Sequence, residues 1–428
     1  MDKGGGFMEH RWYVCIDLKS FFASVECVER GLDPMNTKLV VADSGRSDKT
    51  ICLAITPAMK ALGIPNRCRV FQIPKDIEYI MAPPRMQKYI DYSAEIYGIY
   101  LEYISKEDIH VYSIDEAFLD VTDYLQLYHM TARELGLKLM EEIYKRLGLR
   151  ATCGIGTNLY LAKIALDITA KNAPDFVGEL DEETYRKTMW NHKPLTDFWR
   201  VGAGIARQLE RYYIRTMGDI ARTDEDFLYG LFGVDAELLI DHAWGREPTT
   251  IAHIKAYEPK TNSISSGQVL MRDYNFQEGR LIVKEMMDLL CLDLVDKNLI
   301  TKSITLHIGY TNTVNINPAH GTVSLDFETN ADRVIIPEVV KLYDSIINKR
   351  VPIRRLNITC NKVVKEEYRQ YNFLIDQDEL EKNRKMQKAM IDIKKKFGKN
   401  AILKGMNLQE AATTRERNRQ IGGHKSGE

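Results

Sequence analysis

The first 170 residues alternate between the hydrophobic period of strands and that of helices. The run WYVCIDL at 12–18 is apolar up to a closing aspartate, and the next segment places apolar residues at helical spacing, namely Phe22, Val25 and Val28. This pattern predicts a strand that leads into a helix, with Asp17 at the junction. A strand at 38–42 and the run ICLAI follow, and a helix is expected to begin near Pro57, because proline suits a first helical turn.

The pattern continues through the next part of the chain. Residues 83–104 and 131–147 have helical periodicity, residues 109–121 alternate like two paired strands, and ATCGIG at 151–156 is typical of a strand. Strands and helices in this alternation predict one mixed sheet backed by helices.

Beyond Pro174 the chain changes to short predicted helices separated by glycine and proline, which indicates a small all-α domain. Residues 252–262 are polar and basic and are expected to form a linker. Three later runs, SISSGQVLM, SITLHIGYT and RLNITCNKVV, have the pattern of strands, with helical stripes between them at 281–294 and 337–347. A second α+β domain is therefore expected, followed after Tyr368 by a highly charged, only partly ordered tail.

Length and composition bound the class of protein. A chain of 428 residues with 44% hydrophobic residues is typical of a soluble protein of two to four domains. Charges interrupt every apolar run before the roughly 18 residues that a membrane helix needs, and residues 1–11 hold no apolar signal-peptide core, so we expect a cytoplasmic protein. The seven cysteines are scattered without a C-x-x-C spacing, which favours reduced, mostly buried thiols over a zinc or redox site.

The formal net charge is −1, from 59 basic and 60 acidic residues, and this balance alone argues weakly against a polyanionic partner. The distribution is uneven, because the chain from Lys382 onward is basic, with Lys394, Lys395, Lys396, Lys399, Lys404, Arg415, Arg417 and Arg419. A nucleic-acid partner is therefore not excluded.

Two adjacent acids, Asp115 and Glu116, interrupt the apolar stretch VYSIDEAFLDV at 111–121. Consecutive side chains of a straight strand point to opposite faces, so this pair could not serve one site unless the chain turns. A hairpin tip near Asp115 brings both carboxylates to one edge of the sheet, where Asp17 ends a strand that could pair alongside. Three such carboxylates repel one another in a low dielectric unless cations lie among them.

Carboxylates are the hard oxygen ligands that Mg²⁺ selects, and two ions about 4 Å apart can activate an attacking oxygen and stabilise a leaving one in nucleotidyl transfer. Two other interpretations stay open from these residues alone. Asp115 and Glu116 could be turn residues paired with nearby Arg or Lys, and Asp17 could be a helix N-cap.

Five segments occur in an order and at spacings that resemble a Y-family (translesion) DNA polymerase of the bacterial UmuC-like and DinB-like branch: CIDLKSFFASVE (15–26), AMKALGI (58–64), YSIDEAFLD (112–120), CGIGTNLYLAKIALDITAK (153–171) and FWRVGAGIARQL (198–209). The resemblance covers nearly the whole chain and implies a right-hand α+β multidomain fold. Its parts would be a mixed-sheet palm at 1–20 and 84–178, small fingers at 21–83, a helical thumb with a helix-hairpin-helix at 179–250, a linker at 251–258, an α+β little finger at 259–366 and a charged tail at 367–428.

The resemblance also implies a catalytic centre with two Mg²⁺ ions, or Mn²⁺ in their place. Asp17 and Asp115 would bridge both ions, and Glu116 would bind the catalytic one. The main-chain carbonyl of Leu18 would bind the ion that accompanies the nucleotide.

The nucleotide-binding residues implied by the resemblance begin with two adjacent aromatics. Phe22 takes the place of the steric gate, a ring under the sugar that leaves no room for a 2′-hydroxyl, so deoxynucleotides would be preferred. Phe21 belongs to the same nucleotide-binding segment and is expected to be a core aromatic.

Two lysines would bind the triphosphate, and each comes with a departure from the family pattern. Lys60 matches the basic residue of the fingers, but Pro57 stands where many members have a phosphate-binding tyrosine, so Lys60 is expected to carry more of the charge. The second lysine often follows the aspartate of LAKIALD by three residues, a position that Ala170 occupies here. We assign the role to Lys171, with a one-residue bulge in the preceding helix.

The resemblance places DNA contacts in both halves of the chain. Gly202 and Gly204 would let backbone amides approach a DNA phosphate, although glycines that only permit a tight helix-helix turn are the alternative. In the little finger, cationic or polar positions for phosphate contact are Lys302, His307, Arg354 and Arg355.

A peptide after the little finger, QYNFLI at 370–375, resembles the segment that bacterial polymerases insert into the sliding clamp, with Gln370, Phe373 and Leu374 as anchors. The alternative is a last strand or helix start that packs on the little finger. The basic segments after it could bind DNA or a partner, or could be solvated and disordered.

The leading hypothesis is a monomeric, template-directed DNA polymerase of low fidelity that uses dNTPs and primer-template DNA to copy past damaged bases, as part of DNA repair and the SOS response. Two other classes stay open. One is a catalytically silent protein that docks on DNA and the clamp, and the other is a palm-type nucleotidyl cyclase, in which the helix-hairpin-helix and little finger would have no role.

Overall fold

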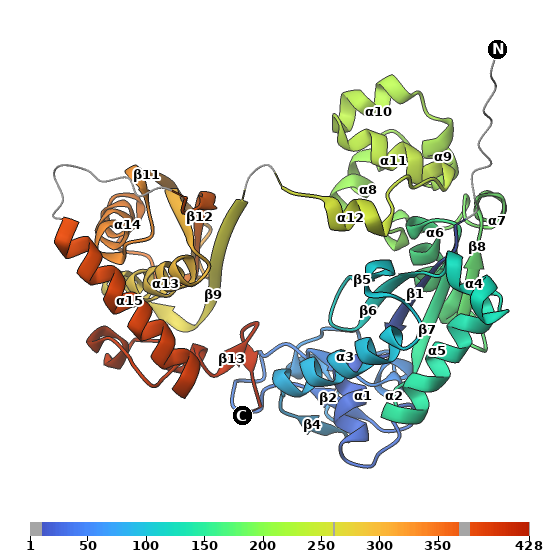
Figure 1. Ribbon diagram of the computed structural model, residues 1–428, viewed down its shortest axis with the longest axis horizontal. Coiled ribbons are helices and arrows are strands. Elements are labelled where there is room, and N and C mark those ends of the chain that lie inside the picture. The colour runs from blue at the N-terminus through green and yellow to red at the C-terminus, as the bar shows by residue number, and fades with distance from the viewer. Residues whose placement is uncertain (1–10, 260–261, 368–376, 428) are drawn as a thin grey trace. The chain divides into compact units, whose positions relative to one another are not determined.

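The computed structural model describes residues 11–259, 262–367 and 377–427 (Figure 1). Contacts divide the chain into two compact units, each with its own sheets and helices: unit 1 comprises residues 1–257 and 425–428, and unit 2 comprises residues 258–424. The expected α+β multidomain fold is confirmed.

Unit 1 combines a mixed sheet with many helices. Its five-stranded sheet has the order β5-β6-β1-β7-β8, and a separate three-stranded sheet has the order β3-β2-β4. The strands are β1 (Tyr13–Leu18), β2 (Leu39–Val41), β3 (Ala54–Ile55), β4 (Ile80–Ala82), β5 (Ile109–Val111), β6 (Glu116–Asp120), β7 (Ala151–Gly156) and β8 (Val177–Leu180). The helices are α1 (Phe21–Val28), α2 (Pro57–Ala61), α3 (Met86–Leu101), α4 (Thr122–Tyr128), α5 (Ala132–Leu147), α6 (Leu159–Ile164), α7 (Glu182–Thr188), α8 (Ala203–Glu210), α9 (Met217–Arg222), α10 (Glu225–Phe232), α11 (Asp235–Trp244) and α12 (Ile251–Ala256).

Side-chain alternation along β1 divides its residues between the two faces of the sheet. On one face, Val14, Ile16 and Leu18 pack into the large apolar core, which also includes residues of α3 and α5. The smaller core on the α6 side contains Tyr13 and Cys15, together with Leu159, Ala162 and Leu166. Asp17 continues this second row, so strand periodicity directs its carboxylate to the α6 side of the sheet.

Two glycines of β7 allow α6 to approach the sheet closely. A Cβ at Gly154 would lie 2.1 Å from the carbonyl oxygen of Ala162, and a Cβ at Gly156 would lie 2.2 Å from the nitrogen of Ala162. Both distances are far below van der Waals contact, so a larger residue at either position would push α6 away from β7. The close approach brings α6 into contact with β1.

The helices after β8 form the predicted all-α region, whose core includes Leu209, Met217, Leu228 and Leu239. Two expectations for this part of the chain were wrong. Strand β8 lies beyond Pro174, where only helices were expected, and it joins the main sheet by parallel pairing with β7. The predicted linker contains helix α12, which packs Ile251 into the core on the α6 side of the sheet.

Unit 2 is a four-stranded sheet of order β11-β10-β12-β9 covered by helices. Its main elements are β9 (Asn262–Tyr274), α13 (Phe276–Asp296), β10 (Leu299–Tyr310), β11 (Ala319–Thr329), α14 (Asp332–Ile346) and β12 (Ile353–Lys365). Strand β11 was missed from the sequence. Inward-facing Ile304, Leu306 and Ile308 of β10 pack with residues of both helices, whereas the other face of the sheet carries mostly polar residues.

The expectation of a partly ordered charged tail was wrong for residues 377–427, which are folded. They form α15 (Gln377–Phe397), α16 (Thr414–Arg417), β13 (Gln420–Ile421) and β14 (His424–Lys425). Ile391 of α15 packs on Leu292 and Val295 of α13, and Lys404 forms ion pairs with Asp288 and Asp332. The alternative of solvated disorder is thereby excluded for these residues.

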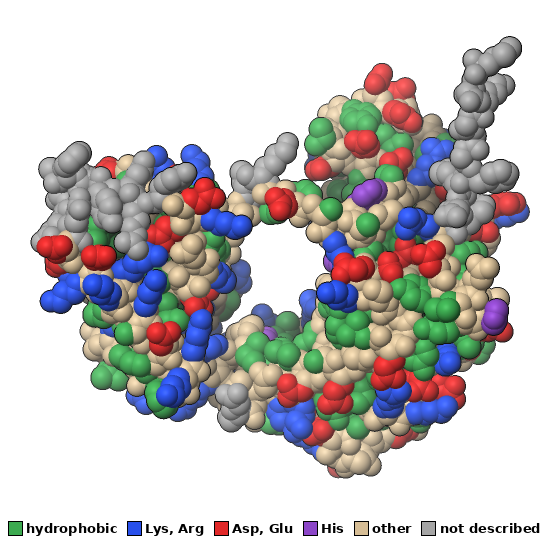
Figure 2. Space-filling model, in the orientation of Figure 1, with side chains coloured by type: hydrophobic (Ala, Val, Ile, Leu, Met, Phe, Trp, Pro, Cys, Tyr) green, Lys and Arg blue, Asp and Glu red, His purple; other side chains and the backbone are tan. Residues whose placement is uncertain are grey.

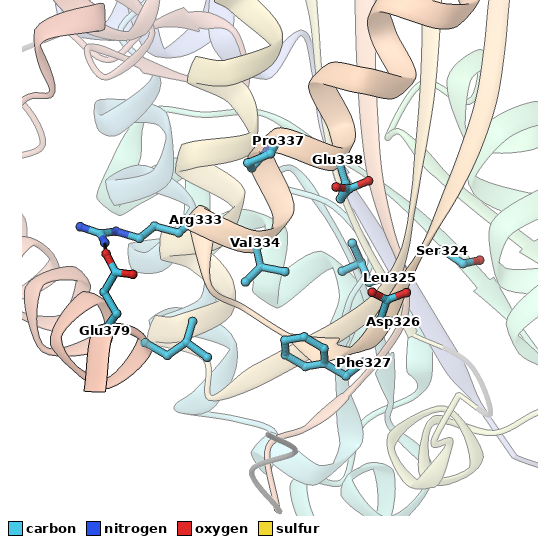
Figure 3. A pocket seen from close by; sticks show the side chains of 10 residues that line it. Ser324, Leu325, Asp326, Phe327, Arg333, Val334, Pro337, Glu338 and Glu379 are labelled. Carbon is cyan, nitrogen blue, oxygen red and sulfur yellow. Dashed lines mark hydrogen bonds and ion pairs between the residues drawn. The ribbon is translucent and has the colours of Figure 1, made fainter. Parts of the chain in front are cut away.

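The surface and the remaining cavities add little to a functional assignment. Lys and Arg side chains are interspersed with Asp and Glu on the face shown in Figure 2. A pocket of about 420 Å³ in unit 2 has Leu325, Phe327 and Val334 in its lining, with the Arg333–Glu379 ion pair at its side (Figure 3).

None of the helices in the described part of the chain combines the length and the apolar character needed to cross a membrane. All seven cysteines are free and buried, as expected.

Candidate active site

The acids Asp115 and Glu116 lie at the tip of a hairpin formed by β5 and β6. Strand pairing joins Val111 to Ala117, and the amides of Tyr112 and Ser113 both donate to the carbonyl oxygen of Glu116, at 2.9 and 3.0 Å. Asp115 therefore occupies the turn, whereas Glu116 is the first residue of β6. The predicted turn is confirmed, and it removes the objection that consecutive side chains must face opposite ways.

Strand β1 brings the third acid to the same edge of the sheet. Asp17 pairs with Glu116 in the antiparallel register of β1 and β6, so the two side chains are direct cross-strand neighbours on the α6 side. The amide of Leu18 donates to the carbonyl oxygen of Asp115 at 3.0 Å, which fixes the turn against the end of β1. Asp17, Asp115 and Glu116 are therefore brought together.

Internal partners hold two of these carboxylates. The hydroxyl of Ser113 donates to Asp115 Oδ1 at 2.7 Å. Glu116 Oε1 lies 2.8 Å from the ammonium nitrogen of Lys163 and accepts a hydrogen bond from the thiol of Cys15 at 3.3 Å. Lys163 and Cys15 thus both contact the same oxygen of Glu116.

Electrostatics show that the acids affect one another. Burial, together with Asp115 and Glu116, raises the pKa of Asp17 to about 7. Within the described residues, however, no three His, Cys, Asp or Glu side chains already surround a common position for an ion. Hard carboxylate oxygens in this close but repelling arrangement fit divalent cations, which would remove the repulsion.

Lys163 supplies the positive charge next to these acids. It projects from α6, is almost fully buried, and also lies 3.1 Å from Asp167 Oδ2. Burial alone would lower the pKa of Lys163, but Asp167 and Glu116 outweigh burial and hold the pKa above its ordinary value. Lys163 therefore carries its charge at neutral pH.

The raised pKa of Asp17 predicts a pH dependence of stability in the metal-free protein. The unfolded carboxyl has a pKa of about 3.9, so between roughly pH 4 and pH 7 the folded state binds more protons and stability falls as pH rises. By pH 8 the cost should be on the order of 4 kcal/mol, because the pKa differs by about three units between the two states. Urea unfolding in EDTA from pH 5 to pH 8 should show a shallower decline for Asp17→Asn than for the wild type. Equal slopes would contradict the prediction, and Asp123→Asn, an exposed acid, serves as the control.

The two adjacent phenylalanines have different environments. Phe21 is buried in the core, as expected, whereas Phe22 is half-buried and stacks on Tyr89 with ring centroids 4.5 Å apart and planes 19° apart. The hydroxyl of Tyr89 donates to Glu26 at 2.8 Å, and Arg85 holds both carboxylate oxygens of Glu26 at 2.9 Å. Phe22 thus rests on a ring that is itself held in place.

Three lysines lie close enough for their charges to interact. Burial, followed by the charge of Lys60, lowers the pKa of Lys19. Burial also lowers the pKa of Lys60, where Lys171 adds to the lowering and Asp17 opposes it. The ammonium of Lys19 also lies 3.7 Å from the ring centre of Phe176. A cluster of lysines beside Asp17 is suited to a polyanionic ligand such as a triphosphate.

The bulge predicted before Lys171 is present. Residues Ala165–Thr169 form one turn of π-helix directly after α6, and such a turn accommodates one extra residue. Lys171 follows this turn, and its ammonium lies 3.5 Å from Asp167 Oδ1.

The glycines of the predicted helix-hairpin-helix are exposed. Gly202 caps the N-terminus of α8 and Gly204 lies in its first turn, both at negative φ. A Cβ at either position would meet no atom within 4 Å. Internal packing therefore does not require these glycines, which speaks against the alternative that they serve only a tight helix turn.

The polar face of the unit 2 sheet carries part of the predicted phosphate-contact set. His307 and Arg355 are exposed on it, and His320 is the cross-strand neighbour of His307. Lys302 is also exposed, whereas Arg354 lies 3.6 Å from Asp273. The predicted clamp-binding residues Gln370, Phe373 and Leu374 lie outside the described residues.

Three residues at the site were missed from the sequence: Lys163, Lys19 and Tyr89. Lys163 had a detectable signal, because it is the single charge in the buried helical run LYLAKI. The contact of Tyr89 with Phe22 joins residues far apart in the chain, and no periodicity reports it.

Comparisons with known proteins identify the family of the chain and a related fold. A sequence profile of the impB/mucB/samB family matches residues 16–167, and the profile of that family's C-terminal domain matches residues 261–373. The chain is 29% identical over 415 residues to UvrX of Bacillus subtilis (strain 168), which is named for UV-damage repair, across 96% of this chain and 97% of UvrX. It is 28% identical over 411 residues to DNA polymerase IV 2 of Halalkalibacterium halodurans, across 96% and 98% of the two chains. A solved Y-family DNA polymerase chimera has a similar fold, with a TM-score of 0.63 and 21% identity over 83% of this chain and 99% of the chimera.

Proposed function

The chain belongs to the impB/mucB/samB family and is a Y-family DNA polymerase of the translesion type, and from this premise we propose that it extends primers by two-metal nucleotidyl transfer at Asp17, Asp115 and Glu116. The observation that carries this proposal is the register that places Asp17 opposite Glu116, with Asp115 in the adjoining turn. A purely structural D-E turn would not need a third acid beside it.

Each of these residues has a defined task in the proposed reaction. Asp17 and Asp115 would hold both divalent ions, Glu116 the one next to the primer end, and the carbonyl of Leu18 the one that accompanies the nucleotide. When bound, such ions favour ionisation of the primer hydroxyl and neutralise charge on the triphosphate. The buried sheet supplies a rigid base that fixes the three carboxylates.

The substrate contacts follow from the side chains around the acids. Lys60 and Lys171 would bind the triphosphate. Lys19 is close enough to both that their charges contribute to its lowered pKa. Phe22, held by Tyr89, would exclude a 2′-hydroxyl. The missing tyrosine at Pro57 makes these lysines more important for the triphosphate.

The DNA would be held by the remaining regions through their phosphates. The parts are a palm at 1–20 and 84–178, fingers at 21–83, a thumb at 179–250 and a little finger at 259–366. The exposed backbone at Gly202 and Gly204 and the polar sheet face of unit 2 support this assignment. The clamp would bind at Gln370, Phe373 and Leu374. A DNA substrate implies work in the cytoplasm.

A glycine substitution separates DNA binding from folding. Gly204→Ala should raise the free energy of unfolding by up to about 0.5–1 kcal/mol, because alanine favours a helix and its Cβ has open space. The same Cβ would stand between the backbone and a DNA phosphate and should weaken primer-template binding about tenfold. Fluorescence anisotropy and urea unfolding measure the two effects.

The matched control is Gly230→Ala, which lies in α10 and also has open space around its Cβ. This variant should gain stability without losing DNA affinity. Unchanged DNA binding by Gly204→Ala would remove the glycines from the proposed DNA contact.

Primer extension on damaged and undamaged templates tests the proposed function as a whole. The wild-type protein should add dNTPs to a primer only with Mg²⁺ or Mn²⁺, and should continue past at least one lesion in a panel. Addition of the host sliding clamp should increase the length of the products. A wild-type protein that binds primer-template DNA but adds no nucleotide would refute the catalytic proposal and favour a DNA-docking role.

A further inference from the structure

Lys163 is a buried cation that the proposed reaction has not yet used. It lies on α6, with its side chain only 9% exposed, between two acids of different elements: Glu116 of β6 at 2.8 Å and Asp167 at 3.1 Å. A lysine is rarely buried to this extent unless its charge is paired. The burial of Lys163 therefore depends on its pairing with these two acids.

The packing of α6 leaves this lysine little freedom. All six residues of the helix are buried, and Gly154 and Gly156 bring the helix directly against β7. The ammonium also lies 5.9 Å from the centre of the Tyr112 ring, at the start of the hairpin turn. Because the helix and the turn are both fixed, the ammonium is a rigid point of attachment for a carboxylate.

These neighbours contact a single carboxylate oxygen of Glu116. Both the Lys163 ammonium and the Cys15 thiol contact Oε1, from α6 and β1 respectively. Two contacts on one oxygen fix the rotamer of the carboxylate, and they leave Oε2 as the oxygen for a cation. A partner that orients a metal ligand in this way commonly changes affinity or activity by about 10- to 100-fold when it is removed.

We propose that Lys163 is a positioning residue that fixes Glu116 through Oε1 so that Oε2 meets the catalytic ion, while its charge offsets part of the negative charge of the site. The inference rests on the proposed function, because Glu116 matters for turnover only if it binds an ion. Lys163 has two opposite effects on that ion. It orients the ligand, which favours turnover, and it repels the cation, which weakens binding.

These opposite effects predict a separation of turnover from metal affinity. In the full-length protein, Lys163→Met should lower kcat for single-nucleotide extension by about 10- to 100-fold and leave the dNTP KM within about threefold. Mn²⁺ affinity, measured by electron paramagnetic resonance without DNA or dNTP, should be higher than in the wild type, because the repelling charge is gone. Lys163→Arg keeps the charge and should recover most of the kcat.

Lys171 provides a matched control because it pairs with the same acid, Asp167, at 3.5 Å. Lys171→Met should raise the dNTP KM with a smaller effect on kcat. If Lys163→Met leaves buried acids unpaired and does not fold, the double variant Lys163→Met/Asp167→Asn keeps the charge balance and should show the same loss of kcat.

A cycle with Glu116→Gln tests whether Lys163 acts through Glu116, independently of polymerase activity. Lys163→Met should change Mn²⁺ affinity by a different factor in the Glu116→Gln background than in the wild-type background, because only the part that acts through Glu116 is lost there. Equal changes in both backgrounds would overturn the inference, as would wild-type kcat in Lys163→Met or a wild-type protein that binds no Mn²⁺. If the wild type binds Mn²⁺ but extends no primer, the proposed function fails while the cycle still decides the role of Lys163.

Discussion

Replacing Asp115 with alanine should reduce metal-dependent primer extension by at least about 10³-fold, the equivalent of ~4 kcal/mol in the activation barrier. Asp115 lies in the hairpin turn, where its main-chain carbonyl accepts a hydrogen bond from the Leu18 amide of β1 and its Oδ1 accepts one from the Ser113 hydroxyl. The neighbouring acid, Glu116, begins β6 and already has Lys163 as a partner, so it cannot take the place of Asp115. Single-turnover extension of a labelled primer with one dNTP would measure the loss directly.

The loss must be distinguished from unfolding. Asp115 is only partly buried and lies outside the apolar core, so its removal should leave the unfolding midpoint within a few degrees of the wild type. Asp123→Ala removes an exposed acid from the first turn of α4, shortly after the hairpin, and should keep wild-type activity. An Asp115→Ala protein that retains more than about a tenth of the activity would refute the catalytic assignment.

The same assay separates the remaining alternatives. A catalytically silent docking protein would bind primer-template DNA without extending it, in the wild type and the variant alike. A nucleotidyl cyclase would consume nucleotide and release pyrophosphate without any primer. Dependence of product on both primer and template is therefore the outcome that only a polymerase gives.

The sequence pattern was sufficient to predict the strands and the turn that carry the three acids. Strand alternation made a straight strand through Asp115 and Glu116 incompatible with a shared site, and the structure has the predicted turn. The one-residue bulge before Lys171 followed from the resemblance, because the family's second lysine often lies three residues after the aspartate of LAKIALD, whereas Lys171 lies four residues after it. The turn that carries Asp115 was therefore predictable from the order of neighbouring residues in the chain.

Other features could not be predicted because they depend on contacts distant in the chain. The position of Lys163 beside Glu116 requires α6 to lie against β7, which the two glycines permit but hydropathy does not reveal. Full order in helix α15 could not be predicted, because the segment is highly charged and its buried side includes the polar residues Asn383 and Gln387. Ion pairs such as that between Lys404 and Asp288 stabilise this region. Composition alone does not distinguish such paired charges from charges exposed to solvent.

Replacing Phe22 with alanine should increase ribonucleotide incorporation by about 10²- to 10³-fold relative to deoxynucleotides, which corresponds to ~3–4 kcal/mol of lost discrimination. The ring is half-buried and stacked on Tyr89, whose hydroxyl is held by the fully buried Glu26. It cannot move aside without breaking that stack, so a 2′-hydroxyl would meet a fixed surface. The ratio of kcat/KM for a dNTP and the matching NTP measures the effect.

Phe21 is the natural control, because it is the adjacent residue of the same type in a different environment. It is 2% exposed, so Phe21→Ala should create a core cavity and cost about 3–5 kcal/mol of stability. Sugar discrimination by the folded fraction of that variant should stay close to the wild type. If Phe21→Ala relaxed the discrimination and Phe22→Ala did not, the gate would have been assigned to the wrong ring, because the core-facing aromatic rather than the stacked one would then meet the sugar.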